Sequence, residues 1–293
     1  MSTLWLRLCH AAMVCIGLLL AACSHLPSPS ERTDRAQALA KAAGWSPLLL
    51  PANGFTLQAW VSEPTHASDT LTVYLEGDGL AWLDESSPSA DPTPQDPLAL
   101  RLALKHRGAV AYLGRPCQYV QAPYRQHCQS RYWTSNRFAP EVIDATSQAL
   151  DQLKDRWGAS QLVLVGYSGG GAVAALVTAQ RKDVARLITL AGNLDHAAWT
   201  KLKRLSPLTG SLNPADFVPE LQRIAQWHLA GGRDLVMPPV IAQGYASRFS
   251  SADRPVVMIL DGFDHRCCWV DHWTPNDPDS LLGQLFFKPV RPQ

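Results

Sequence analysis

Short apolar runs, each followed by a turn signal, recur along most of the chain. They are rich in β-branched or aromatic residues, and the later ones are almost continuously apolar, which is typical of parallel strands covered on both faces. We expect each run to form one strand of a central sheet. The runs are residues 55–61, 71–76, 109–113, 161–165, 186–190, 226–229 and 256–260.

Segments with helical periodicity separate several of these runs. Residues 141–157 repeat apolar side chains at helical spacing directly after Pro140, which suits the first turn of a helix. Residues 170–181 are apolar nearly all round and therefore predict a buried helix. Because strand and helix alternate, the sequence predicts an α/β fold, with a mostly parallel central sheet and helices on both faces.

Two long connections interrupt this alternation, at residues 82–97 and 195–220. Connections of this length in a compact domain usually serve as lids or binding loops. A surface insertion without function is an equally open interpretation. We expect residues 36–293 to form a single domain with a lid-like insertion around 195–220.

The N-terminal segment has the pattern of an export signal. Arg7 is its one charged residue, and an uncharged stretch follows at residues 8–22. The most apolar part of that stretch, residues 11–20, is too short to span a bilayer but fits the core of a signal peptide. We therefore expect residues 1–22 to be removed. Residues 23–35 are mostly polar and contain two prolines, which predicts a flexible tether.

Composition and charge exclude some classes of protein. The chain has 293 residues, and its hydrophobic content of 46% is enough for a packed core, which argues against a disordered protein. It carries 26 Lys and Arg against 25 Asp and Glu. A nucleic-acid binder needs a basic face to offset phosphate charge, so we expect no nucleic-acid partner.

The strongest chemical signal is the sequence Gly166-Tyr167-Ser168-Gly169-Gly170. This Gly-x-Ser-x-Gly motif lies between a buried strand and a glycine-led helix, which is the context of a nucleophile elbow. A seryl hydroxyl is a poor nucleophile unless it projects clear of the sheet beside a base, and the flanking glycines permit that tight turn. The motif therefore predicts Ser168 as a nucleophile.

An elbow predicts an acid after a later strand and a histidine after the last one. Asp234 follows the run at residues 226–229, and His265 follows the run at 256–260. Spacing alone leaves alternatives open, namely Asp195 for the acid and His196, His228 or His272 for the base.

Residues 55–275 resemble the α/β-hydrolase family in the order and placement of these three residues. The resemblance implies Ser168 as nucleophile, His265 as general base and acid, Asp234 as the carboxylate that orients it, and no cofactor. Three shorter segments are similar to a group of uncharacterised bacterial α/β-hydrolase lipoproteins, a likeness that implies no substrate. They are residues 76–79, 115–119 and 191–196.

Acyl transfer also needs N–H donors for the oxyanion that develops on the substrate. The N–H of Gly169 directly follows the nucleophile. Similar esterases supply a second donor from the loop after an early strand, which here reads Glu76-Gly77-Asp78-Gly79, so Asp78 is the second candidate. A carboxylate near an oxyanion would oppose it. We therefore expect the side chains of Glu76 and Asp78 to point away, or Asp78 to bind a polar group of the substrate.

The segment Leu20-Ala21-Ala22-Cys23-Ser24 resembles the lipobox of bacterial lipoproteins. The resemblance implies that Cys23 is acylated and becomes the first residue of the mature chain. Ser24 is similar to the residue found in lipoproteins passed to the outer membrane, which implies a bacterial cell envelope location, on the outer membrane facing the periplasm. The alternative is an ordinary signal peptide, with Cys23 incidental.

Four further cysteines survive processing, namely Cys117, Cys128, Cys267 and Cys268. An even number in an exported protein suggests disulfides. We favour a Cys117–Cys128 bridge, because neighbours in sequence can pair only through a strained ring, and we leave the redox state of Cys267 and Cys268 open. No second Cys or His pair has metal-ligand spacing, so we expect no metal site.

These observations predict a membrane-anchored serine hydrolase that cleaves a small-molecule or lipid carboxylic ester through an acyl-enzyme intermediate. Two alternatives remain. One is an acyltransferase with a lipid or glycan acceptor, and the other is a catalytically silent binding scaffold on the same fold.

Overall fold

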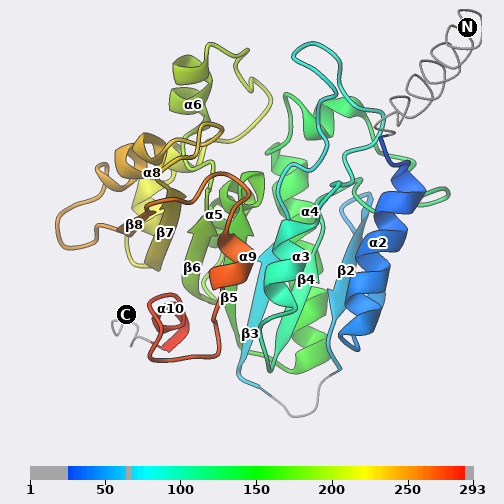
Figure 1. The fold of residues 1–293 in the computed structure, drawn as a ribbon, viewed down its shortest axis with the longest axis horizontal. Coiled ribbons are helices and arrows are strands. Elements are labelled where there is room, and N and C mark those ends of the chain that lie inside the picture. The colour runs from blue at the N-terminus through cyan, green and yellow to red at the C-terminus, as the bar shows by residue number, and fades with distance from the viewer. Residues whose placement is uncertain (1–25, 64–67, 288–293) are drawn as a thin grey trace, which may run out of the picture.

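The computed structural model describes residues 26–63 and 68–287, which form one eight-stranded sheet between layers of helices (Figure 1). The strand order is β1-β2-β4-β3-β5-β6-β7-β8; β2 is antiparallel to β1 and β4, and all other neighbouring pairs are parallel. The predicted α/β fold class is confirmed. The strands are β1 (Ser46–Ala52), β2 (Phe55–Val61), β3 (Thr70–Leu75), β4 (Val110–Leu113), β5 (Gln161–Tyr167), β6 (Val184–Leu190), β7 (Ala225–Gly231) and β8 (Val256–Leu260).

Helices cover both faces of the sheet, with α2, α3 and α9 in front and α4 and α5 behind in Figure 1. Each face has its own apolar core, one including α4 and α5 and the other including α2, α3 and α9. The helices are α2 (Pro29–Ala42), α3 (Leu98–Ala103), α4 (Pro140–Trp157), α5 (Gly169–Gln180), α6 (His196–Lys203), α7 (Val218–Leu221), α8 (Pro239–Ala246), α9 (Trp269–His272) and α10 (Gln284–Phe287), with 3-10 turns η1 (Ser130–Trp133) and η2 (Pro214–Asp216).

The flexible tether expected through residue 35 is wrong in its second half, because α2 begins at Pro29. Ser28 and Glu31 form a reciprocal capping box that satisfies free N–H groups at the start of this helix. Arg32 is buried and donates to the backbone oxygens of Asp91 and Thr93. Residues 29–35 are therefore fixed against the loop that follows β3.

The segment from 1 to 25 lies outside the described residues, and with it the expected signal peptide and Cys23. Across the part of the chain that is described, no helix combines the length and the apolar character needed to cross a bilayer.

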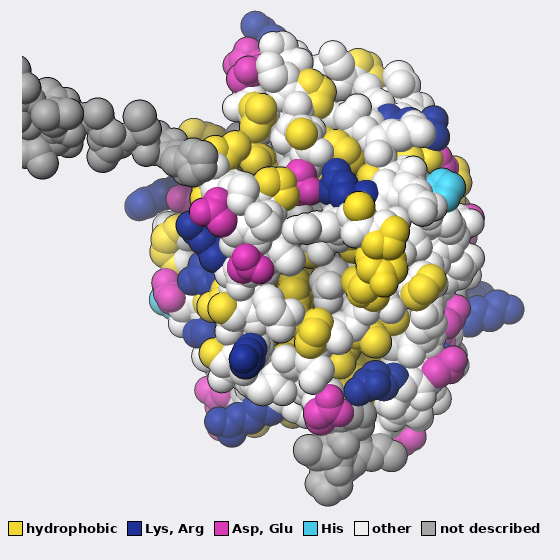
Figure 2. All heavy atoms as spheres, turned by 90° about the vertical axis from the view of Figure 1, so that its right-hand side faces the viewer, with side chains coloured by type: hydrophobic (Ala, Val, Ile, Leu, Met, Phe, Trp, Pro, Cys, Tyr) yellow, Lys and Arg dark blue, Asp and Glu magenta, His cyan; other side chains and the backbone are white. Residues whose placement is uncertain are grey.

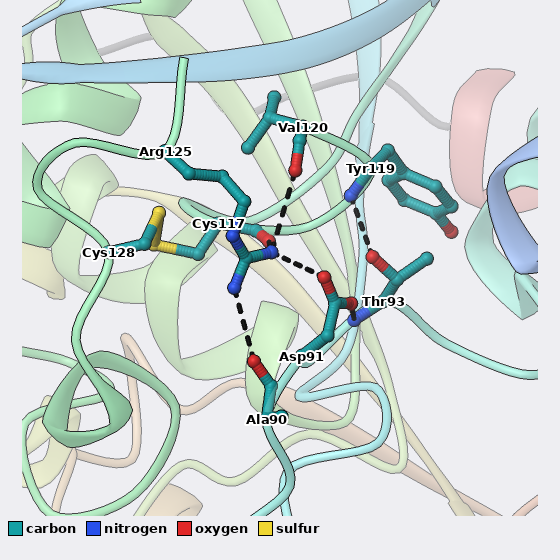
Figure 3. Close-up of a disulfide and its surroundings, with 8 residues drawn as sticks. All are labelled: Ala90, Asp91, Thr93, Cys117, Tyr119, Val120, Arg125 and Cys128. Carbon is teal, nitrogen blue, oxygen red and sulfur yellow. Dashed lines mark hydrogen bonds and ion pairs between the residues drawn. A yellow bond between two sulfur atoms is a disulfide. The ribbon is translucent and has the colours of Figure 1, made fainter. Parts of the chain in front are cut away.

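The favoured disulfide, Cys117–Cys128, is present, with its Cα atoms 5.6 Å apart (Figure 3). Nearby, Arg125 forms an ion pair with Asp91, so the loop after β4 is joined to the loop after β3. The structure also joins Cys267 to Cys268, which the sequence disfavours. The loop that holds them is closed by a hydrogen bond of 2.8 Å from the Asp264 N–H to the Cys267 oxygen.

Charged side chains of both signs are interspersed on the side of the molecule that carries α2 and β2 (Figure 2). This pattern agrees with the near balance of bases and acids in the sequence. A mixed surface gives no extended field of one sign.

Candidate active site

Ser168 lies at the sharp turn between β5 and α5, in the strained backbone conformation of φ 52° and ψ −121°. Glycine is required on both sides of it. A Cβ on Gly166 would lie 2.4 Å from the Gly170 oxygen, and a Cβ on Gly170 would lie 2.4 Å from the backbone oxygens of Leu75 and Glu76. The motif thus brings the elbow into direct contact with the end of β3.

The structure brings Ser168, His265 and Asp234 together at the carboxyl edge of the sheet. The His265 Nε2 atom lies 3.0 Å from the Ser168 Oγ atom, and its Nδ1 atom lies 2.8 Å from the Asp234 Oδ2 atom. A carboxylate can only accept hydrogen bonds, so Nδ1 donates to Asp234 and Nε2 is left to accept the Ser168 proton. This is the geometry of a nucleophile, its base and the group that orients the base.

Neighbouring groups hold the acid and the base in place. The other oxygen of Asp234 accepts the N–H groups of Val236 and Met237 at 2.8 and 2.7 Å, and its carboxylate is buried. The backbone oxygen of His265 accepts the Tyr167 hydroxyl at 2.9 Å. Because the carboxylate and the His265 backbone are both anchored, the imidazole is held in one orientation.

The alternatives for the acid and the base have other partners. Asp195 caps α6 through the Ala198 N–H and pairs with Arg248 at 2.6 Å. The other three histidines are placed elsewhere: His228 is buried beside Thr189 and Gln226, His196 packs against Phe138, and His272 packs against Phe263.

The two expected oxyanion donors lie next to each other beside the nucleophile. A Cβ on Gly169 would lie only 2.0 Å from the Asp78 Oδ1 atom, so these residues are in close contact. Gly169 is the first residue of α5, where an N–H has no acceptor within the helix. Among the described residues, neither the Asp78 N–H nor the Gly169 N–H has a protein acceptor. Both are therefore free to bind a developing oxyanion.

The Asp78 carboxylate is held by two arginines rather than left free. Arg115 lies 3.2 Å from its Oδ1 atom and Arg137 lies 2.6 Å from its Oδ2 atom. Burial would raise the pKa of Asp78, but the two guanidinium groups outweigh it and hold the pKa below its ordinary value. The expectation that this side chain points away is not met, because its Oδ1 atom lies close to Gly169 while the carboxylate pairs with Arg115 and Arg137. Together, Asp78, Arg115 and Arg137 carry a net charge of about +1, which favours an oxyanion nearby.

Glu76 fixes the same loop from inside the protein. Its Oε1 atom accepts the Gly77 N–H at 2.9 Å, and its Oε2 atom accepts the Tyr112 hydroxyl at 3.1 Å. Burial raises the pKa of Glu76 to about 7, although the hydrogen bonds that its carboxylate accepts act to lower that pKa. The carboxylate of Glu76 is thus engaged by structural hydrogen bonds from Gly77, Ala99 and Tyr112.

A pocket of about 360 Å³ opens over Ser168 and His265. The loop at residues 80–98 forms one wall, and α6 contributes Trp199 to another. Both long connections therefore border the pocket, while the lid-like role expected of residues 195–220 stays a prediction. Among the described residues, no cluster of three or more His, Cys, Asp or Glu is arranged to hold a metal.

Two pocket residues were not found from the sequence, Arg137 and Asn193. Asn193 is buried, its N–H donates to the Ser168 oxygen at 3.1 Å, and its Oδ1 atom has no protein partner within the described chain. Arg137 reaches Asp78 across 59 positions of sequence. Arg137 lies in no motif, and Asn193 lies in the segment 191–196, whose likeness implied no role for it. The contacts of both residues exist only in the folded chain.

Neither a family model nor a curated protein matches this sequence. Solved structures do match. An alpha-beta serine hydrolase homologue from Coxiella burnetii has a TM-score of 0.54 at 14% identity, and covers 83% of this chain and 96% of its own. An esterase from Pyrococcus furiosus has a TM-score of 0.55 at 12% identity, and covers 83% of this chain and 90% of its own. The protein Est1E from Butyrivibrio proteoclasticus has a TM-score of 0.53 at 14% identity, with 78% of this chain and 94% of its own covered.

These structures are similar in fold to this chain over most of both lengths. At such low identity the likeness concerns the fold, whereas the site rests on its own geometry. The described chain has the α/β-hydrolase fold.

Proposed function

We propose that this chain is a membrane-anchored serine hydrolase that cleaves carboxylic esters through an acyl-enzyme intermediate. The single observation that carries the proposal is the unbroken hydrogen-bonded series from Ser168 through His265 to Asp234. The esterases and serine hydrolases among the structural neighbours support the same reaction class. Cys23 in its lipobox-like segment supports the anchor.

In the first half of the reaction, the Ser168 Oγ atom attacks the ester carbonyl carbon while its proton passes to the His265 Nε2 atom. The carbonyl oxygen becomes an oxyanion between the N–H groups of Asp78 and Gly169. The bond to the alcohol oxygen then breaks, and the alcohol leaves with the proton from His265.

In the second half, water attacks the acyl group on Ser168 and gives its proton to His265. Collapse of the second oxyanion breaks the bond to the Ser168 Oγ atom, which recovers the proton. The carboxylic acid is released and the enzyme returns to its starting state. Asp234 stabilises the imidazolium in both halves and remains ionised.

Labelling with a fluorophosphonate, together with hydrolysis of a series of short-chain esters, tests the proposal. We expect the parent to be labelled at Ser168 and to release acid, and Ser168→Ala to lose both properties because it lacks the nucleophile. Ser86→Ala, which changes an exposed serine in the loop bordering the pocket, is the matched control and should retain both. A parent that is neither labelled nor active on any ester would favour the silent scaffold.

A further inference from the structure

The described chain begins at the edge of the sheet that carries the pocket. Arg32 of α2 is bonded to the backbone of Asp91 and Thr93, and the next residues of that loop, 94–96, line the pocket. In Figure 1 the start of α2 and the helix α6 lie at this same edge. Cys23 precedes Leu26 by three residues, which span at most about 10 Å. An acyl group on Cys23 would therefore hold the pocket edge close to the membrane.

Exposed apolar side chains line this pocket or stand within three positions of its lining residues in the sequence. Leu83, Leu202 and Leu235 are 55%, 52% and 79% exposed, and the pocket-lining residues Trp82 and Val236 are 39% and 49% exposed. We name these five residues the apolar rim. Apolar side chains gathered around one opening mark an interaction surface, whereas scattered ones do not.

Hydrogen bonds join the parts of the apolar rim that come from different elements. The Trp199 Nε1 atom donates to the Val236 oxygen at 2.8 Å, and the Lys203 Nζ atom donates to the Leu235 oxygen at 2.8 Å. Helix α6, which carries Leu202 one turn after Trp199, is thereby fixed to the loop after β7. Leu202, Leu235 and Val236 are therefore presented by one connected part of the structure, and Trp82 and Leu83 come from the loop after β3.

The charges beside the apolar rim have both signs. Lys203, Arg233 and Arg266 are exposed, and so are Asp84 and Glu85 of the loop after β3. Such a mixture gives little net attraction to an anionic surface. The affinity of this surface for a membrane must therefore come from its apolar side chains. An electrically neutral bilayer is then enough to bind it.

We propose that the apolar rim lies against the surface of the lipid bilayer that holds the anchor, so that the pocket opens toward lipid esters. The inference rests on the proposed function through the acylated Cys23. It specifies the substrate class: an ester whose acyl chain reaches Ser168 directly from the bilayer. A water-soluble ester would reach the same site without help from the rim.

Kinetics with the mature acylated chain in phosphatidylcholine vesicles test this inference. We compare a long-chain lipid ester dissolved in those vesicles with a short-chain ester dissolved in water. In the double variant Leu83→Asp and Leu235→Asp, we expect the rate on the lipid ester to fall at least about tenfold, because charged side chains resist contact with lipid. The rate on the soluble ester should stay within about twofold of the parent, because neither leucine lines the pocket.

The matched control is Leu281→Asp, a change at a leucine that is 58% exposed. Leu281 lies near α10. The Leu285 oxygen of α10 accepts a hydrogen bond from Arg186, which is near the amino end of β6, so Leu281 is at the edge of the sheet opposite the pocket. This variant should match the parent on both esters. Equal rates on the lipid ester for parent and double variant would overturn the inference, and so would an equal loss on the soluble ester.

A measurement without turnover separates this inference from the proposed function. Bromine on the lipid chains quenches tryptophans that touch the bilayer, so quenching should be stronger in the parent than in Trp82→Phe. Equal quenching in both would overturn the docking, even where esters are hydrolysed. A second outcome separates the two proposals. If quenching is lower in Trp82→Phe than in the parent, but the parent hydrolyses no ester, the docking is supported and the proposed hydrolase activity is rejected. A mature chain without acyl groups would overturn both the anchor and the docking.

Discussion

Asp234 and Asp195 are both buried acids that follow strands of the same sheet, but they do different work. Asp234 shares its two oxygens between His265 and the turn at residues 236–237. Asp195 uses its oxygens to cap α6 and to pair with Arg248. One therefore acts on the imidazole and the other on the stability of a helix.

This division predicts opposite effects of two matched substitutions. We expect Asp234→Asn to lower kcat at least about a hundredfold, because an amide at this position favours the wrong imidazole tautomer. Asp195→Asn should retain most of kcat. Its free energy of unfolding should fall by on the order of 1 kcal/mol, because the helix cap and the ion pair with Arg248 are weaker. Steady-state kinetics and denaturant unfolding of both variants decide the matter. A larger loss of kcat in Asp195→Asn would move the acid to that residue.

The residues found from the sequence are those that local order marks. Ser168 has its own motif, and Asp234 and His265 each follow a strand that the apolar pattern predicts. Arg137 has no such mark, and Asn193 has only its place in the segment 191–196, which predicted no role for it. Their roles depend on contacts with the loop after β3 and with the elbow, which only the folded chain brings together.

Among the elements, the apolar runs predict the parallel strands well, and in β5, β6 and β7 almost every residue is buried, whereas the edge strand β8 is partly exposed. The edge strand β1 was not predicted, since it contains Pro47 and Pro51 and exposes alternate residues. Helix α2 was also missed, because its buried residues are Arg32, Ala36 and Ala40, with no large apolar side chain among them. Its polar first turn resembles a linker until the contacts of Arg32 are known.

The loop between β3 and α3 carries a pH-dependent stability through Glu76. The folded state raises the pKa of Glu76 from 4.5 to about 7, so the folded chain binds this proton more tightly than the unfolded chain. Stability from this group is therefore present at low pH and is lost as the pH rises from 4.5 through 7. The loss is on the order of 3 kcal/mol.

We expect Glu76→Gln to remove that component, because the amide stays neutral and fills the same space. Urea unfolding of both proteins between pH 5 and pH 8 measures the difference. The parent should lose stability relative to Glu76→Gln as the pH rises through about 7. A constant difference between the two proteins across this range would contradict the assignment.

At the scale of the whole molecule, the proposed location of the site at a membrane depends on the N-terminal segment. The removal of residues 1–22 takes away one base and no acid, so the mature chain would have balanced charge and no electrostatic attraction to an anionic surface. The proposed membrane residence would therefore depend on the covalent lipid. Two or more acyl chains on one cysteine give stable anchoring, whereas a single chain is only marginal.

Cys23→Ser tests this anchor in cells. We expect the variant to lose acyl labelling and to move from the membrane fraction to unprocessed precursor or soluble protein, because serine lacks the sulfur that carries the lipid. The catalytic residues lie far along the chain from this position, so activity on soluble esters should persist in the recovered protein. The matched control is Ser24→Ala, which leaves the sulfur in place and should still be acylated. Acyl labelling that survives in Cys23→Ser, or a mature N-terminus at any residue other than Cys23, would contradict the lipoprotein interpretation.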